Sequence, residues 1–251
     1  MKRTPGRTVA PVVQRVRLEY AKRGRLRFSS HRDFQRALER AIRRAGIPIA
    51  FSAGFSPHPR ISYANSAPTG TASEAEYVEL AVTETIDPAW VRSRLDSALP
   101  EGFDVLRVVE ATPPDLAARL QASLWRMVLP GVTPSEATSA AARFLDEEAV
   151  EVSRMTKSGM RTFDARGPVV SLAVEPGESE KGCAILHVVV RHVTPSVRPD
   201  DVLSALRNVA DLVPPAPARV TRLAQGPFDP RTGSVGDPFA PDIVAESASQ
   251  H

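Results

Sequence analysis

The chain contains two successive segments with a common predicted order of elements: strand, helix, strand, strand, helix, strand. The first segment has one extra hairpin strand near its start, and the second has an additional basic hairpin. The clearest element of the first segment is a helix over residues 31–45. Its apolar side chains recur at spacings of three and four, as on the buried stripe of an amphipathic helix: Phe34, Leu38, Ala41, Ile42 and Ala45. Ser29 or Ser30 can cap its start, and Gly46 is placed to end it.

Alternation of polar and apolar residues predicts the other elements of the first segment. Strands are expected over residues 14–20, 25–28, 47–52, 74–83 and 103–109, with a second helix over residues 87–99. Residues 53–73 are expected to form a loop, because five glycines and prolines interrupt any regular element.

The second segment follows a linker over residues 113–121 that carries a short helix. Strands are expected over residues 122–129, 150–155, 169–174, 184–192 and 219–224, helices over 134–146 and 199–209, and a basic hairpin reaching residue 163. The order of elements predicts an α+β protein of two ferredoxin-like (split βαβ) subdomains in tandem, over residues 13–111 and 122–225. Residues 226–251 lack periodicity and predict a disordered C-terminal tail.

Positive charge is concentrated at the start of the chain. Residues 1–60 hold 15 Lys and Arg against 3 Asp and Glu, a net of +12, whereas residues 61–251 hold 17 against 26, a net of −9. This asymmetry favours a surface that binds a polyanion, usually nucleic acid. Alternatively, the excess reflects a general preference for arginine, since the chain has 28 Arg and 4 Lys, and the surface is merely solvated.

Cysteine content and hydropathy exclude several classes of protein. The single Cys183 rules out an internal disulfide framework and a cysteine-based zinc site, and we predict no metal site. No apolar run is long enough for a membrane span or a signal peptide, so a cytoplasmic protein is expected. The glycine patterns of nucleotide-binding loops and the signatures of serine and zinc hydrolases are also missing.

The first candidate motif covers residues 27–33, where a strand is expected to run into the first helix. Free N–H groups at a helix start attract anions, and Arg27 and Arg32 add positive charge. His31 is a candidate acid or base. In the alternative interpretation, Ser30 and Asp33 only cap the helix and His31 is a structural polar residue.

The second candidate motif covers residues 51–63, and prolines Pro57 and Pro59 flank His58 within it. Flanking prolines hold the backbone extended, so His58 can be presented at little entropic cost. The neighbouring aromatic and cationic side chains are of the kinds that stack on bases and contact phosphates: Phe55, Arg60 and Tyr63. Alternatively, Gly54 and the aromatic residues belong to a structural loop that plugs the core.

Two further motifs carry charged side chains. Glu74 and Glu76, after Ser73, would share one face of a strand, where two carboxylates can transfer protons, hold Mg²⁺ or simply form a solvated edge. Residues 154–166 predict a basic hairpin turning at Gly159, with Lys157 and Arg161 placed to contact a nucleic-acid backbone, an acidic partner or only water.

Together these motifs resemble the radical-SAM-linked family of bacterial proteins, a domain of unknown function that occurs alone or fused after a radical-SAM module. The resemblance rests on Arg25–Asp33, on the run Gly54-Phe55-Ser56-Pro57-His58-Pro59-Arg60, and on Ser73–Tyr77. It implies an accessory to radical-SAM chemistry, with any iron–sulfur cluster and S-adenosylmethionine carried by a partner. With one cysteine, this chain lacks the cluster ligands itself.

Three hypotheses follow, in order of preference. The first is an RNA-binding or RNA-presenting accessory in RNA modification or processing. Its contacts would be the aromatic and basic residues already named and the outer arginines of the first helix, Arg36, Arg40, Arg43 and Arg44. The second is a subunit that docks a separate radical-SAM enzyme. The third is an enzyme acting on RNA or a nucleotide, with His31 and His58 as acid and base.

Overall fold

The computed structural model describes residues 10–156, 159–175 and 183–249, and it divides the chain into two compact units. The first unit comprises residues up to Ala118 together with the segment from Phe239 onward, and the second comprises Arg119–Pro238. Helices and antiparallel strands occur in both units, which confirms the α+β class. Among the described residues, no helix has the length and apolar character needed to cross a membrane.

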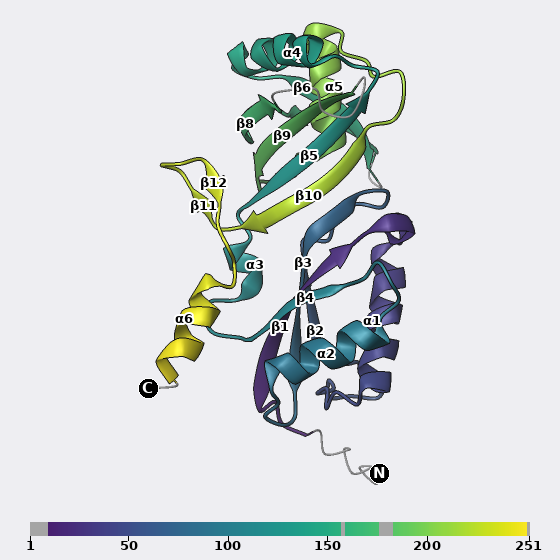
Figure 1. Cartoon of the computed structure of the whole chain (residues 1–251), viewed down its shortest axis with the longest axis vertical. Helices are drawn as coiled ribbons and strands as arrows, with labels where there is room; N and C mark the ends of the chain where they lie inside the picture. The colour runs from purple at the N-terminus through teal and green to yellow at the C-terminus, as the bar shows by residue number, and fades with distance from the viewer. Residues whose placement is uncertain (1–9, 157–158, 176–182, 250–251) are drawn as a thin grey trace, which may run out of the picture. The chain divides into compact units, whose positions relative to one another are not determined.

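The first unit has the element order β1 (Gln14–Lys22), α1 (His31–Ala45), β2 (Ile61–Ala64), β3 (Ala72–Val82), α2 (Pro88–Ala98), β4 (Val105–Glu110). Its strands lie in the order β4-β1-β3-β2, and every neighbouring pair is antiparallel. Helices α1 and α2 lie side by side and pack on one face of the strands (Figure 1).

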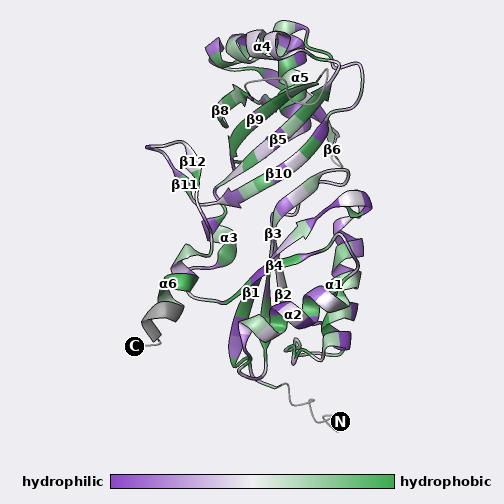
Figure 2. Cartoon of the chain, viewed as in Figure 1, coloured by the Kyte–Doolittle hydropathy of each residue, from purple (hydrophilic) through white to green (hydrophobic). Residues whose placement is uncertain are grey.

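Helix α1 forms as its apolar stripe predicts. Ser30 caps the start in a capping box with Asp33, and Gly46 ends the helix with a left-handed φ of 72°. The stripe packs against alternate side chains of β1 and β3, including Leu18 and Leu80. The arginines therefore point outward, and Figure 2 shows the resulting bands of hydrophilic and hydrophobic residues along α1.

The second unit repeats this arrangement with an inserted hairpin. Its elements are β5 (Ala122–Pro130), α4 (Pro134–Asp146), the hairpin β6 (Glu151–Thr156) and β7 (Gly159–Asp164), β8 (Val169–Val174), β9 (Cys183–Arg191), α5 (Pro199–Ala210) and β10 (Arg219–Gly226). The strands lie in the order β10-β5-β9-β8, again antiparallel. Helices α4 and α5 cover the core around Met127, Phe144 and Leu186. A short helix α3 (Leu116–Arg119) lies in the expected linker.

Two strand predictions in the first unit are wrong. Residues 25–28 belong to a 3₁₀ turn, η1 (Gly24–Phe28), which the hydrogen bond from Ser29 N–H to the Leu26 carbonyl closes at 2.9 Å. Residues 47–52 form only isolated bridges at Ile49 and Phe51. The strand that pairs with β3 is instead β2, which lies inside the predicted loop.

The predicted disorder of residues 226–251 is also wrong for the described part of that segment. It forms a small hairpin, β11 (Phe228–Asp229) and β12 (Ser234–Val235), and then helix α6 (Ala240–Ser249). Phe239 is 0% exposed, its ring meets that of Tyr77 edge-on, and Arg107 lies over it. One anchoring side chain carries too little hydrophobic signal for a periodicity search to detect.

A buried ion pair holds α6 on the face of β1 and β3 opposite α1. The Arg17 guanidinium donates to both carboxylate oxygens of Asp242, at 3.0 and 3.1 Å, and to Glu79 at 2.9 Å. Thr112 donates to the same carboxylate through its N–H and its hydroxyl. Arg17 and Asp242 are each only 2% exposed, so water cannot solvate either charge in place of its partner.

Changing Asp242→Ala should therefore destabilise the protein by about 3 kcal/mol, because the buried Arg17 guanidinium keeps only part of its acceptors and the Thr112 N–H and hydroxyl lose theirs. Urea denaturation of the full chain measures the change in the free energy of unfolding. The matched control is Asp229→Ala, which breaks the exposed pair with Arg231 and should cost about 1 kcal/mol or less. Equal losses for the two variants would show that α6 is not held by this ion pair.

Candidate functional site

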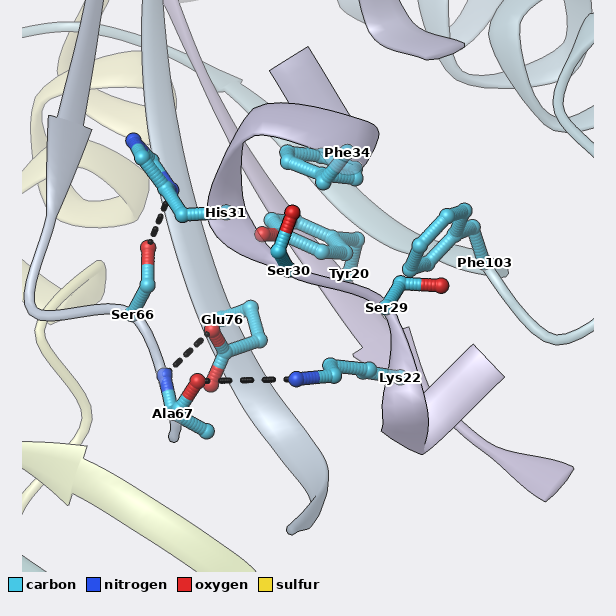
Figure 3. Close-up of a pocket in the computed structure, with 10 residues that line it drawn as sticks. All are labelled: Tyr20, Lys22, Ser29, Ser30, His31, Phe34, Ser66, Ala67, Glu76 and Phe103. Atoms are coloured by element: carbon cyan, nitrogen blue, oxygen red, sulfur yellow. Dashed lines mark hydrogen bonds between the residues drawn. The ribbon is translucent and has the colours of Figure 1, made fainter. Parts of the chain in front are cut away.

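A small pocket lies at the start of α1 in the first unit, and three separate stretches of the sequence line it (Figure 3). Its apolar side is a cluster of aromatic rings in which Tyr20 stacks on Phe34, with 4.1 Å between ring centroids, and Phe103 meets Phe34 edge-on. The polar side consists of hydroxyl, imidazole and charged groups: Lys22, Ser29, Ser30, His31, Ser66 and Glu76. The pocket therefore has an apolar wall and a wall of hydrogen-bonding groups.

Two buried charged side chains, Lys22 and Glu76, hold the loop over residues 66–70, which closes the polar side of the pocket. Lys22, 6% exposed, donates to the carbonyls of Ala67 and Pro68 at 3.5 and 3.2 Å. Glu76, 1% exposed, accepts from the Ala67 N–H at 2.9 Å. Gly70 adds a hydrogen bond from its N–H to the Arg27 carbonyl. These contacts fix the loop over residues 66–70 against the turn that precedes α1.

His31 is the exposed titratable group of this pocket. Its Nδ1 lies 3.0 Å from the Ser66 hydroxyl oxygen, and its Nε2 lies 3.0 Å from the Gln35 side-chain nitrogen. When the Gln35 amide donates to Nε2, the proton of the neutral ring is on Nδ1 and is donated to Ser66; the other tautomer accepts from Ser66. The hydrogen bond between His31 and Ser66 can thus run in either direction, depending on the tautomer of the ring.

Tyr63, in the second motif, contacts two residues that line this pocket. Its ring contacts those of His31 and Phe34 edge-on, at 4.9 and 6.3 Å between centroids. Burial and, secondarily, the charge of Glu39 raise the pKa of the Tyr63 phenol. The ring is half-buried and supports His31, so it is not an open stacking surface.

The remainder of the second motif forms a narrow hairpin. Ser52 binds His58 twice, from Ser52 N–H to the His58 carbonyl at 2.8 Å and from His58 N–H to the Ser52 hydroxyl at 3.0 Å. Phe51 forms a bridge with Pro59, and Gly54 adopts a φ of 125° at the tip beside Pro57. Phe55 is therefore presented fully exposed on a braced loop.

The structure does not bring His58 into the pocket of His31. His58 is exposed in the hairpin and is not one of the ten residues that line the pocket. Its fixed backbone follows from the flanking prolines and the two hydrogen bonds with Ser52.

The outer face of α1 carries a row of exposed arginines. Arg32, Arg36, Arg40 and Arg43 follow one another at spacings of three or four, so they lie along one side of the helix. Within the described residues, Arg32, Arg40 and Arg43 make no hydrogen bond or ion pair, and neither does the Arg60 side chain. Arg44 differs, because its guanidinium donates to the Ala98 carbonyl at 3.2 Å.

Asp33 and Ser73 have structural roles. The Ser30 hydroxyl and backbone hydrogen-bond to Asp33 and lower the pKa of its carboxyl. Ser73 is buried, and its hydroxyl accepts from the Ala75 N–H at 3.2 Å. Glu74 forms an ion pair with Arg23, which also binds Asp104. Glu74 and Glu76 thus lie in different surroundings although they are two residues apart on β3.

The basic hairpin of the fourth motif is formed by β6 and β7. Arg161 is exposed and lies across from Arg154, which is held by an ion pair with Asp201. Lys157 lies outside the described residues. Among the described groups of the whole chain, no three His, Cys, Asp or Glu side chains come together as a metal site would require.

Sequence reasoning missed Lys22 and Ser66 as parts of the pocket. Ser66 lies 35 residues after His31, and Lys22 lies before the η1 turn that leads into α1; the approach of both depends on the pairing of β1 with β3. The alternation in β1 would have indicated that Lys22 shares a face with Leu18 and Tyr20, and a lysine on a core face is an unusual placement.

A family model described as an uncharacterized protein conserved in bacteria (DUF2344) matches residues 15–199. The chain therefore belongs to this family. The match spans the α1 arginine row, the pocket, the Phe55 hairpin and the β6–β7 hairpin, and it ends at the start of α5. No curated protein matches the chain.

Because Glu76 holds the Ala67 N–H and lies beside Lys22 in the pocket, Glu76→Ala should free the loop over residues 66–70. We expect faster amide hydrogen exchange there and a loss of about 1–3 kcal/mol in the free energy of unfolding, from buried groups left unsatisfied. Glu74→Ala removes the half-exposed carboxylate two residues away, which pairs with Arg23, and serves as the control. The same exchange profile in both variants would contradict the anchoring role of Glu76.

Proposed function

We propose that the first unit binds RNA and that the protein presents RNA for modification or processing. The observation that carries this proposal is the row of exposed arginines on α1, three of which have no partner among the described residues. Arginines free of protein carboxylates can neutralise phosphates without first breaking an ion pair, and each contact releases a bound counterion from the nucleic acid.

The aromatic hairpin supports the same proposal. Phe55 is fully exposed at the tip of a loop that Pro57, Pro59 and the Ser52–His58 hydrogen bonds stiffen. A stiff loop loses little conformational entropy when its aromatic ring stacks on a base. Arg60 follows the hairpin with its side chain exposed and would add a phosphate contact.

We further propose that each unit has a ferredoxin-like, split βαβ topology. The support is the common element order and the common strand order, in which the last strand lies at one edge, next to the first. In the second unit the β6–β7 hairpin is then an insertion between the first helix and the second strand. An experimental structure with a different strand order in either unit would refute this topology.

The partner in this proposal is a separate radical-SAM protein of the cytoplasm, which would bring the iron–sulfur cluster and S-adenosylmethionine. The support is the resemblance of the Gly54–Arg60 run and its neighbouring motifs to the radical-SAM-linked family. Purification of the full chain from native lysate, with its bound proteins and RNA identified, tests this association. Recovery of RNA without any radical-SAM protein would leave RNA binding standing and refute the partner.

An enzyme that uses His31 and His58 together is the less favoured function. His31 hydrogen-bonds to Ser66 at the pocket edge, but His58 does not line that pocket. A single-turnover assay on bound RNA would distinguish this alternative, because His31→Ala would then abolish product formation without weakening binding.

The charge contacts should appear in the salt dependence of RNA binding. Changing Arg32, Arg40 and Arg43 together to Glu should weaken binding at least tenfold at low salt and make the slope of log affinity against log salt shallower by about 2, since each lost contact with a single strand contributes about 0.7. Fluorescence anisotropy with a labelled RNA oligonucleotide measures both.

The control for this triple variant is Arg143→Glu, because Arg143 is likewise an exposed arginine in the last turn of a helix, α4. It lies in the second unit and should leave affinity and slope close to those of the wild type. Binding that ignores both salt and the α1 substitutions would rule out the arginine row as the RNA contact.

A further inference from the structure

Phe28 is an exposed aromatic residue at the junction between β1 and α1. It is 59% exposed, although phenylalanine is usually among the most buried side chains. It directly precedes Ser29, Ser30 and His31, which line the pocket of the first unit. An exposed ring at this place is an apolar surface next to a set of hydrogen-bonding groups.

The backbone that carries Phe28 is fixed on both sides. The η1 turn is closed by hydrogen bonds from Leu26 N–H to the Arg23 carbonyl and from Ser29 N–H to the Leu26 carbonyl, at 3.0 and 2.9 Å. Leu26 packs against the core, and the Arg27 carbonyl accepts from the Gly70 N–H at 2.8 Å. The ring is therefore presented from a rigid turn, so binding to it costs little ordering entropy.

Arg27 supplies a cation at the same ring. Its guanidinium carbon lies 4.5 Å from the centroid of Phe28, within the range of a cation–π contact. Arg27 occupies one side of the ring, and the high exposure of Phe28 leaves ring surface open for a second planar group. A nucleobase stacked there would contact the ring while its phosphate lay near a positive charge.

The residues around Phe28 are better suited to bind a nucleotide than to bind another protein. A protein hot spot has an aromatic anchor inside a desolvated apolar patch. Apart from Leu26, which packs against the core, the residues that flank Phe28 in the chain are cationic or hydroxyl-bearing: Arg25, Arg27, Ser29 and Ser30. Cations beside an isolated ring are the combination that single-stranded nucleic acids use, since phosphate and base are both within reach.

We propose that the Arg27–Phe28 pair is a base-stacking site for an unpaired nucleotide, so that the RNA bound by the first unit is single-stranded at this point. This inference rests on the proposed RNA binding and narrows its substrate. A base inside a duplex is covered on both faces by its neighbours and cannot stack on Phe28 unless it leaves the helix. A single strand or a loop offers the base without that cost.

The test uses the full chain and a short single-stranded RNA that contains 2-aminopurine, whose fluorescence responds to stacking, next to a duplex of the same length. Phe28→Ala should weaken binding of the single strand by about fivefold to a hundredfold, the range expected for one lost base stack. It should also reduce the fluorescence change to the part that stacking on Phe55 contributes, and the weaker binding of the duplex should stay as in the wild type.

Three further variants control this experiment. Phe28→Tyr keeps the ring and should retain the fluorescence change, whereas Phe28→Leu keeps the apolar bulk without the ring and should behave like Phe28→Ala. Trp90→Ala removes another exposed aromatic residue of the first unit, on α2, and should change nothing. Phe28→Leu also serves if Phe28→Ala lowers the melting temperature, because it keeps apolar bulk at the turn.

The outcomes separate this inference from the function on which it rests. Wild-type affinity and fluorescence in Phe28→Leu, alongside weakened binding in the α1 arginine triple variant, would overturn the stacking site and leave RNA binding intact. Tighter binding of the duplex than of the single strand would also overturn it. Absence of any salt-dependent RNA binding by the wild type would remove both proposals.

Discussion

The first unit depends on the alternation of β1, which buries apolar side chains on one face and charged side chains on the other. Leu18 faces the core under α1, whereas Arg17 faces away and is just as completely buried. A buried guanidinium needs several acceptors, and Glu79 on β3 supplies only part of them. Asp242 and the Pro114 carbonyl supply the rest, and the segment from Phe239 onward returns to the first unit with α6. The opposite face is thereby left to α1 and α2.

This division explains which parts of the fold could be predicted from the sequence. Helix α1 was predicted with its bounds and its Gly46 end. Its apolar stripe, its capping serine and its terminal glycine are all local sequence signals, and they indicate the same helix. Strand β2 was missed because its four residues lie among prolines and acquire their conformation only by pairing with β3. The order of the C-terminal segment was missed because it comes from Phe239 and Asp242, each of which binds residues more than a hundred positions away.

The candidate site divides in the same way. The outward arginines of α1 follow from helical periodicity and could be read directly from the sequence. The approach of Lys22, Ser66 and Glu76 to His31 could not, because it needs the register between β1 and β3. The sequence also did not give the direction of two aromatic side chains: the ring of Tyr63 is half-buried against His31, and Phe28 is 59% exposed.

The central claim is that RNA contacts the first unit along α1, the η1 turn and the Phe55 hairpin. Ultraviolet crosslinking of the full chain to RNA, followed by mass spectrometry of the crosslinked peptides, tests it most directly because aromatic residues that stack on bases crosslink readily. We predict crosslinks within residues 25–60, with Phe28 and Phe55 as the modified positions. Crosslinks confined to residues 119–238, or RNA that is recovered without any crosslink in the first unit, would contradict the account.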